Sequence, residues 1–111
     1  ILNFGHTFGH SIEKLTNYRI RHGFAVSIGM MMACKVASKI TGFNQTERLE
    51  RLLKILGLPT STKLDIGSIV QETSKDKKAW YGKTVLILPE TIGKVIVREV
   101  EQQDLLRILR G

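Results

Sequence analysis

The sequence predicts a mainly α-helical domain with one short β-hairpin near its C-terminus. Apolar residues recur at helical spacing through most of the chain. The two runs TVLILP and KVIVREV, at 84–89 and 94–100, are rich in the β-branched residues that strands favour. No glycine-rich nucleotide-binding fingerprint follows a strand. At 111 residues the chain has the length of one domain, which we place at 1–111.

The first two helices are predicted from their apolar faces and their glycines. Residues 3–16 form the first helix. Its apolar face consists of Phe4, Phe8, Ile12 and Leu15. Gly5 and Gly9 each cost a helix about 1 kcal/mol relative to alanine, so we expect another backbone or a ligand to approach closely there. The second helix covers residues 23–41 and ends at Gly42.

The remaining elements are predicted from caps and turns. Asn44 followed by Glu47 is typical of a capping box at the start of a third helix, which ends at the GLP of 57–59. Its core-facing residues are predicted to be Leu49, Leu52, Leu53 and Leu56. A fourth helix is predicted at 65–74, and a last one at 101–110. The two strands are separated by ETIG.

Composition limits the possible partners and location. No apolar run reaches the roughly 20 residues that span a bilayer, so we expect no membrane partner. The single cysteine, Cys34, suits a reducing cytoplasm. The net charge of +7 is scattered, without an arginine-rich stripe, so we expect no nucleic-acid partner. A basic helical module that binds nucleic acid or a protein stays open as an alternative.

The chain places its three histidines early. His6 and His10 are four residues apart on one predicted helix, so they project from the same face, and His22 follows after a stretch long enough for a turn. Imidazole is a common zinc ligand, and a catalytic zinc takes three protein ligands. Solvated or core histidines remain an alternative, as does a simple helix cap for Asn3. HTFGH lacks the glutamate of the HExxH metalloprotease motif, so proteolysis is not indicated.

These segments together resemble a known family. LNFGHTFGHSIE, HGFAVSIGMMMA and DKK, followed by the hairpin, resemble the C-terminal half of 3-dehydroquinate synthase in order and spacing. Sugar phosphate cyclases are similar more distantly, and metal-dependent alcohol and glycerol dehydrogenases more loosely. The resemblance implies the helical C-terminal domain of the dehydroquinate synthase-like fold. The chain has no initiator methionine, so we expect the C-terminal half of a longer two-domain enzyme, inactive without its N-terminal NAD-binding domain.

The resemblance also implies roles for individual residues. His6 and His22 would bind Zn²⁺ (or Co²⁺), with a third ligand, a glutamate, from a segment upstream of this chain. NAD⁺ would bind mainly to the N-terminal domain. His10 would be catalytic and would contact the substrate phosphate region, and Asn3 would contact the phosphate side. A lysine of DKK would reach the phosphate. Lys77 is the first choice and Lys78 the second.

The activity implied by the resemblance is the conversion of 3-deoxy-D-arabino-heptulosonate 7-phosphate to 3-dehydroquinate and phosphate, in aromatic amino acid biosynthesis. The family is usually dimeric, so a homodimer is expected of the full-length protein. A related sugar phosphate cyclase or a metal-dependent polyol dehydrogenase are the alternative enzymes. The chain departs from the family at one position, because HGFAV places Phe24 where the family usually has glutamate. That change removes a carboxylate that could orient a metal-binding histidine.

Overall fold

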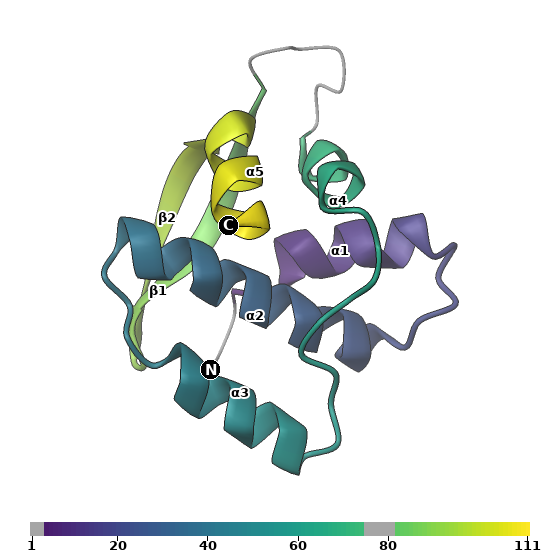
Figure 1. Ribbon diagram of the computed structural model, residues 1–111, viewed down its shortest axis with the longest axis horizontal. Helices are drawn as coiled ribbons and strands as arrows, with labels where there is room; N and C mark the ends of the chain where they lie inside the picture. Colours follow the sequence, from purple (N-terminus) through teal and green to yellow (C-terminus); the bar gives the residue numbers. More distant parts are fainter. Residues whose placement is uncertain (1–3, 75–81) are drawn as a thin grey trace.

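The computed structural model describes residues 4–74 and 82–111, and these form five helices and one two-stranded antiparallel sheet (Figure 1). The elements in chain order are α1 (His6–Leu15), α2 (His22–Ile40), α3 (Thr46–Ile55), α4 (Ile66–Thr73), β1 (Lys83–Thr91), β2 (Lys94–Glu101) and α5 (Gln102–Arg110). The predicted mainly α fold with one C-terminal hairpin, and the predicted order of its elements, are confirmed.

The central element is α2, which crosses the middle of the molecule and contacts α1, α3, α5 and β1 (Figure 1). Its length and its mean hydropathy of 1.3 would suit a membrane span, yet 56% of that apolar window is buried inside the fold. A helix that is covered on several sides needs apolar residues around most of its circumference. Packing in the core therefore accounts for the composition of α2.

The crossing of α1 and α2 is made by glycines on both helices. A Cβ placed on Gly29 of α2 would collide with the carbonyl oxygen of Gly5 and lie 2.8 Å from the amide nitrogen of Gly9. A Cβ on Gly5 would lie 2.5 Å from the carbonyl oxygen of Val26. The two helices are therefore in backbone contact, which only glycine permits at these positions. The close approach expected at Gly5 and Gly9 is confirmed, with a backbone as the neighbour.

A tight reversal after α1 returns the chain toward its own helix. Asn17 and Tyr18 both have positive φ, at 54° and 59°. The Tyr18 amide donates to the carbonyl of Glu13 at 2.7 Å, and the Asn17 amide donates to that of Lys14 at 3.0 Å. These two bonds make a Schellman ending, in which asparagine takes the left-handed position more readily than most residues. The reversal lets α2 begin at His22, beside α1.

Several predicted helix boundaries are confirmed. Gly42 and Gly57 take positive φ, at 76° and 77°, directly after the last turns of α2 and α3. Asp65 caps α4, because its carboxylate accepts a hydrogen bond of 2.9 Å from the amide of Ser68.

The predicted capping box of α3 is wrong. The helix begins at Thr46, so its capping position falls on Gln45, which makes no side-chain cap hydrogen bond. The side chain of Asn44 instead accepts a hydrogen bond from the side-chain amide of Gln45 at 3.1 Å. The helix starts one residue later than the motif implied, so Asn44 lies before the capping position.

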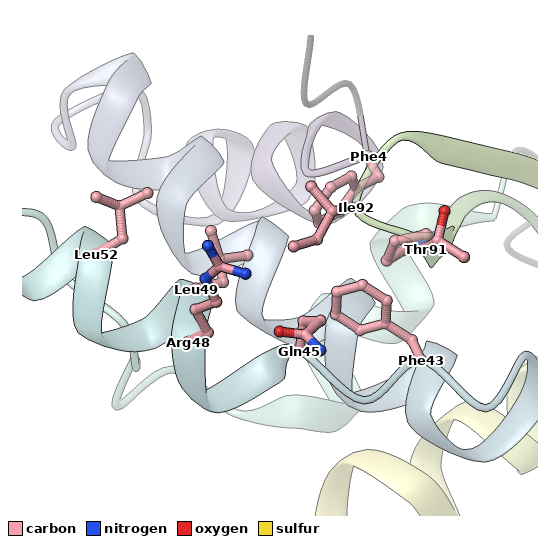
Figure 2. A pocket seen from close by; sticks show the side chains of 9 residues that line it. Phe4, Phe43, Gln45, Arg48, Leu49, Leu52, Thr91 and Ile92 are labelled. Carbon is pink, nitrogen blue, oxygen red and sulfur yellow. The ribbon is translucent and has the colours of Figure 1, made fainter.

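The apolar face of α3 is also narrower than predicted. Of the four leucines predicted to face the core, only Leu53 is buried, whereas Leu52 and the C-cap residue Leu56 are 48% and 62% exposed. The helix packs against α2 along one edge and otherwise lies at the rim of the molecule (Figure 1). Between α3 and the tip of the hairpin lies an apolar cavity of about 310 Å³ (Figure 2). It is lined by Phe4, Phe43, Gln45, Arg48, Leu49, Leu52, Pro89, Thr91 and Ile92.

The hairpin packs one face on α2 and α5. Leu86 and Leu88 of β1 are buried, while Val85 and Val97 point outward with 56% and 69% exposure. The strands extend further than predicted, so that the turn is the two residues 92–93 rather than the four of ETIG. A register irregularity between Pro89 and Thr91 accommodates the longer strand.

Candidate metal and substrate site

The fold brings all three histidines together. His6 and His10 project from consecutive turns of α1, and His22 is the first residue of α2. The ring centres of His6 and His22 lie 5.8 Å apart, those of His6 and His10 5.9 Å, and those of His10 and His22 6.4 Å. The glycine crossing and the reversal after α1 create this cluster, because they set the start of α2 against the histidine face of α1.

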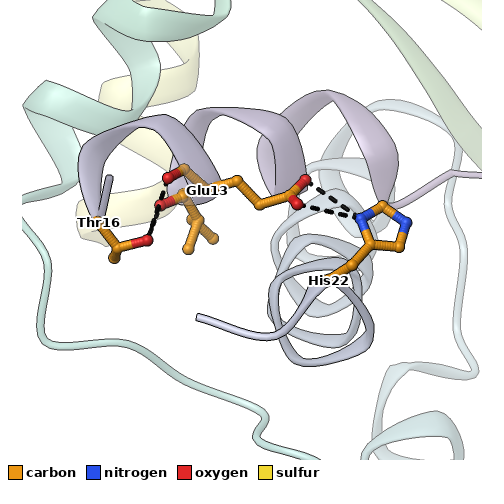
Figure 3. Close-up of polar contacts among 4 residues, drawn as sticks. Glu13, Thr16 and His22 are labelled. Atoms are coloured by element: carbon orange, nitrogen blue, oxygen red, sulfur yellow. Dashed lines mark hydrogen bonds and ion pairs between the residues drawn. The ribbon is translucent and has the colours of Figure 1, made fainter. Parts of the chain in front are cut away.

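Glu13 joins the cluster through a contact with His22 (Figure 3). Nδ1 of His22 lies 3.2 Å from each carboxylate oxygen of Glu13. The glutamate side chain is 13% exposed and the histidine side chain is 59% exposed. Sequence reasoning missed Glu13. Its signal was its position three residues after His10, which puts it on the histidine face of α1.

The donor set fits a divalent metal ion in two respects. Nδ1 of His6 is buried and has no hydrogen-bond partner among the described residues, so no hydrogen bond there competes with a metal ion for this imidazole. Two imidazoles on one tetrahedral zinc, with Zn–N bonds of about 2.1 Å, place their ring centres about 5 Å apart. The separation of His6 and His22 is slightly wider, so a small side-chain adjustment would bring both onto one ion.

The described part of the chain does not complete a metal site. Within residues 4–74 and 82–111, no group of three or more His, Cys, Asp or Glu side chains is arranged to hold a metal ion. A third protein ligand would have to come from elsewhere, as a catalytic zinc usually takes three.

An open, largely apolar hollow of about 350 Å³ adjoins His6 and His22. Its lining comprises His6, His22, Gly23, Val26, Ser27, Met30, Leu49, Leu52, Leu53, Leu56 and Leu58. The exposed side chains of Leu52 and Leu56 are part of this lining, so the histidine cluster adjoins an apolar surface.

The other sequence-predicted site residues have different outcomes. Asn3, Lys77 and Lys78 lie outside the described residues. Phe24 is half-buried, and the guanidinium carbon of Arg21 lies 5.7 Å from its ring centre. That distance suits a cation–π contact. The position where the resemblance led us to expect a carboxylate is thus occupied by an aromatic side chain paired with a cation.

Comparison with known proteins identifies the family. The sequence profile of the 3-dehydroquinate synthase C-terminal domain matches residues 1–79. The chain belongs to the 3-dehydroquinate synthase C-terminal family. Among its relatives, the 3-dehydroquinate synthase of Thermococcus kodakarensis is 51% identical over 111 residues, which cover 100% of this chain and 32% of that protein. The enzyme of Pyrococcus abyssi is 43% identical over 109 residues, 98% of this chain and 32% of that protein.

Solved structures agree with the family assignment. A crystal structure of 2-deoxy-scyllo-inosose synthase, complexed with carbaglucose-6-phosphate, NAD⁺ and Co²⁺, matches with a TM-score of 0.78 and 26% identity. The match covers 96% of this chain and 33% of that one. The dehydroquinate synthase-like fold expected from the sequence is confirmed. The chain spans about a third of the length of the relatives it matches.

Proposed function

We propose that this chain is the metal- and substrate-binding part of a 3-dehydroquinate synthase. The enzyme would convert 3-deoxy-D-arabino-heptulosonate 7-phosphate to 3-dehydroquinate and phosphate, in the shikimate pathway. The observation that carries the proposal is the cluster of three histidine rings, 5.8 to 6.4 Å apart, in a member of this family. The cluster combines metal-binding and proton-transferring groups at one point of the surface.

His6 and His22 would hold the metal, Zn²⁺ or Co²⁺. Their support is the unpartnered Nδ1 of His6 and the proximity of the His22 ring. A divalent metal, when bound, polarises an oxygen of the substrate and lowers the pKa of a hydroxyl there. A glutamate from a preceding segment would be the third ligand. The related 2-deoxy-scyllo-inosose synthase, solved with Co²⁺ and NAD⁺, supports a metal ion and NAD⁺ as the cofactors.

His10 would contact the phosphate region of the substrate and transfer a proton there. Its ring is exposed and stands one helical turn from His6, so a substrate that reaches the metal also reaches His10. A neutral imidazole transfers protons efficiently near neutral pH. Asn3 and Lys77, or Lys78, would bind the phosphate through an amide and a charge-assisted hydrogen bond. Holding the phosphate in one orientation reduces the entropic cost of its elimination.

The remaining requirements would be met outside this chain. An N-terminal domain of the same polypeptide would bind NAD⁺. The exposed side chains of Leu52 and Leu56 supply an apolar surface beside the histidines that such a domain would cover. We expect the complete enzyme to be a soluble cytoplasmic homodimer. The fragment alone would be inactive.

Zinc content and phosphate release test the proposal, measured on the complete polypeptide with NAD⁺ and the heptulosonate phosphate. His10→Ala should keep the metal and lose about 10²- to 10⁴-fold in phosphate release, the range of general acid–base catalysis. His6→Ala should lose both metal and activity, and Lys14→Ala, on the same helix, should change neither.

Other outcomes would contradict the proposal in different ways. Full phosphate release by His10→Ala, or full metal content in His6→Ala, would refute the assigned roles. Alcohol oxidation without phosphate release would indicate a polyol dehydrogenase. Release of phosphate with a different carbocyclic product would indicate another sugar phosphate cyclase. DNA affinity that falls steeply with salt, without metal or activity, would favour the basic binding module.

A further inference from the structure

We propose that Glu13 is a positioning residue for His22. Its carboxylate would hold the imidazole as the tautomer with hydrogen on Nδ1, which leaves the lone pair of Nε2 for a metal ion. The tautomer assignment stands on the contacts of this chain alone. The inference that a metal ion binds the lone pair of Nε2 rests on the proposed function.

The contact has the chemistry that this assignment requires. Both carboxylate oxygens of Glu13 lie 3.2 Å from Nδ1 of His22. An ionised carboxylate only accepts hydrogen bonds, so Nδ1 must be the donor. In a neutral imidazole one nitrogen donates and the other accepts, which places the lone pair on Nε2. In Figure 3 the other ring nitrogen of His22 faces away from Glu13.

The Glu13 side of the contact is largely shielded from solvent. The Glu13 side chain is only 13% exposed, whereas exposed ion pairs lose most of their strength to solvent. A largely buried carboxylate needs hydrogen-bond donors, and the His22 ring supplies one. Glu13 and His22 therefore constrain each other, although His22 itself is 59% exposed.

The backbone of Glu13 is held independently of its side chain. Its carbonyl accepts a hydrogen bond from the hydroxyl of Thr16 at 3.1 Å (Figure 3). It accepts a second one from the amide of Tyr18 at 2.7 Å. The bond from Tyr18 belongs to the Schellman ending of α1. Replacing the carboxylate should leave this turn intact. A Glu13 variant can therefore change the tautomer of His22 without unfolding the protein.

Glu13 supplies a carboxylate beside His22 in a chain that has Phe24 at the position after the HG motif. Metal-binding histidines usually donate their second ring nitrogen to a carboxylate, a carbonyl or water, which fixes ring and tautomer. The HG motif here has no carboxylate at position 24, and α1 supplies one from Glu13 instead. In this chain the carboxylate that contacts His22 therefore comes from α1 and not from the helix of His22.

Long-range ¹⁵N–¹H NMR on histidine-labelled protein tests the inference without any metal. In its neutral form we expect His22 to carry hydrogen on Nδ1. Glu13→Ala should shift it toward the Nε2–H form. Glu13→Gln should retain the Nδ1–H form, because the amide oxygen still accepts. Glu99→Ala, which removes an exposed carboxylate from β2, is the matched control and should change nothing.

Zinc affinity provides a second readout in the complete polypeptide. Glu13→Ala should weaken zinc about 10- to 100-fold in a chelator competition, the usual effect of removing such a partner. An Nε2–H tautomer in the parent protein would overturn the proposal even if Glu13→Ala failed to fold, and so would an unchanged tautomer in a folded Glu13→Ala. Failure of the synthase assay would refute the proposed function and leave the tautomer result standing.

Discussion

The glycine crossing of α1 and α2 makes a sharp prediction for Gly29→Ala. The new methyl group would meet the Gly5 carbonyl oxygen and lie 2.8 Å from the Gly9 amide nitrogen. Both are backbone atoms, so neither can rotate away, and the helices must separate. Overpacking of this kind costs about 1–3 kcal/mol. Because the backbone must move, we expect a cost at the upper end of this range, about 3 kcal/mol. The higher helix propensity of alanine offsets about 1 kcal/mol of this cost. We therefore expect the free energy of unfolding to fall by about 2 kcal/mol.

Gly23→Ala is the matched control on the same helix. A Cβ at Gly23 meets no atom of the described residues within 4 Å, so only the difference in helix propensity applies, and the protein should gain up to about 1 kcal/mol. The same chemical change thus has opposite signs at two positions of α2. Its sign depends only on what the new methyl group touches.

Urea unfolding followed by helical circular dichroism measures both effects. With a slope of about 2 kcal/mol/M, the Gly29→Ala midpoint should fall by about 1 M and the Gly23→Ala midpoint should rise by up to about 0.5 M. The slope itself should stay constant if both states keep their compactness. A Gly29→Ala midpoint equal to or above the parent's would refute the backbone contact on which the histidine cluster depends.

Two further predictions concern titratable groups. Burial raises the pKa of the Cys34 thiol from 9.0 to about 12, so the folded protein should resist Ellman's reagent at about pH 8 and react when unfolded in urea. Because the folded pKa is raised, the associated stability is present below pH 9.0 and lost as pH rises toward about 12, and rapid labelling of the folded protein would disprove the burial. The backbone amide of Ser68, and then its hydroxyl, lower the pKa of Asp65 below 3.8. Stability from this cap should be present above pH 3.8 and disappear as pH falls through the folded value. Asp65→Asn should remove that acid dependence, as urea unfolding across this range would show, and an ordinary Asp65 pKa by NMR would contradict the cap.

Local patterns were sufficient for the order of the elements and for most of their ends. The local signals act within a few residues, so they can be recognised from the sequence without knowledge of the rest of the fold. They are the apolar spacing, the left-handed glycines after α2 and α3, and the cap at Asp65. The same holds for His6 and His10, whose spacing of one helical turn places them on one face. Motif order also indicated the family, which the sequence profile confirmed.

Tertiary packing decided what those patterns left open. Helical periodicity marks an apolar face but not how much of it a neighbour covers, which is why Leu52 and Leu56 were wrongly assigned to the core. Glu13 became part of the candidate site only because the chain reverses after α1 and sets His22 against it. Gly29 matters only because another backbone lies against it. Each of these depends on contacts between segments that are separated along the chain, and local spacing carries no information about such contacts.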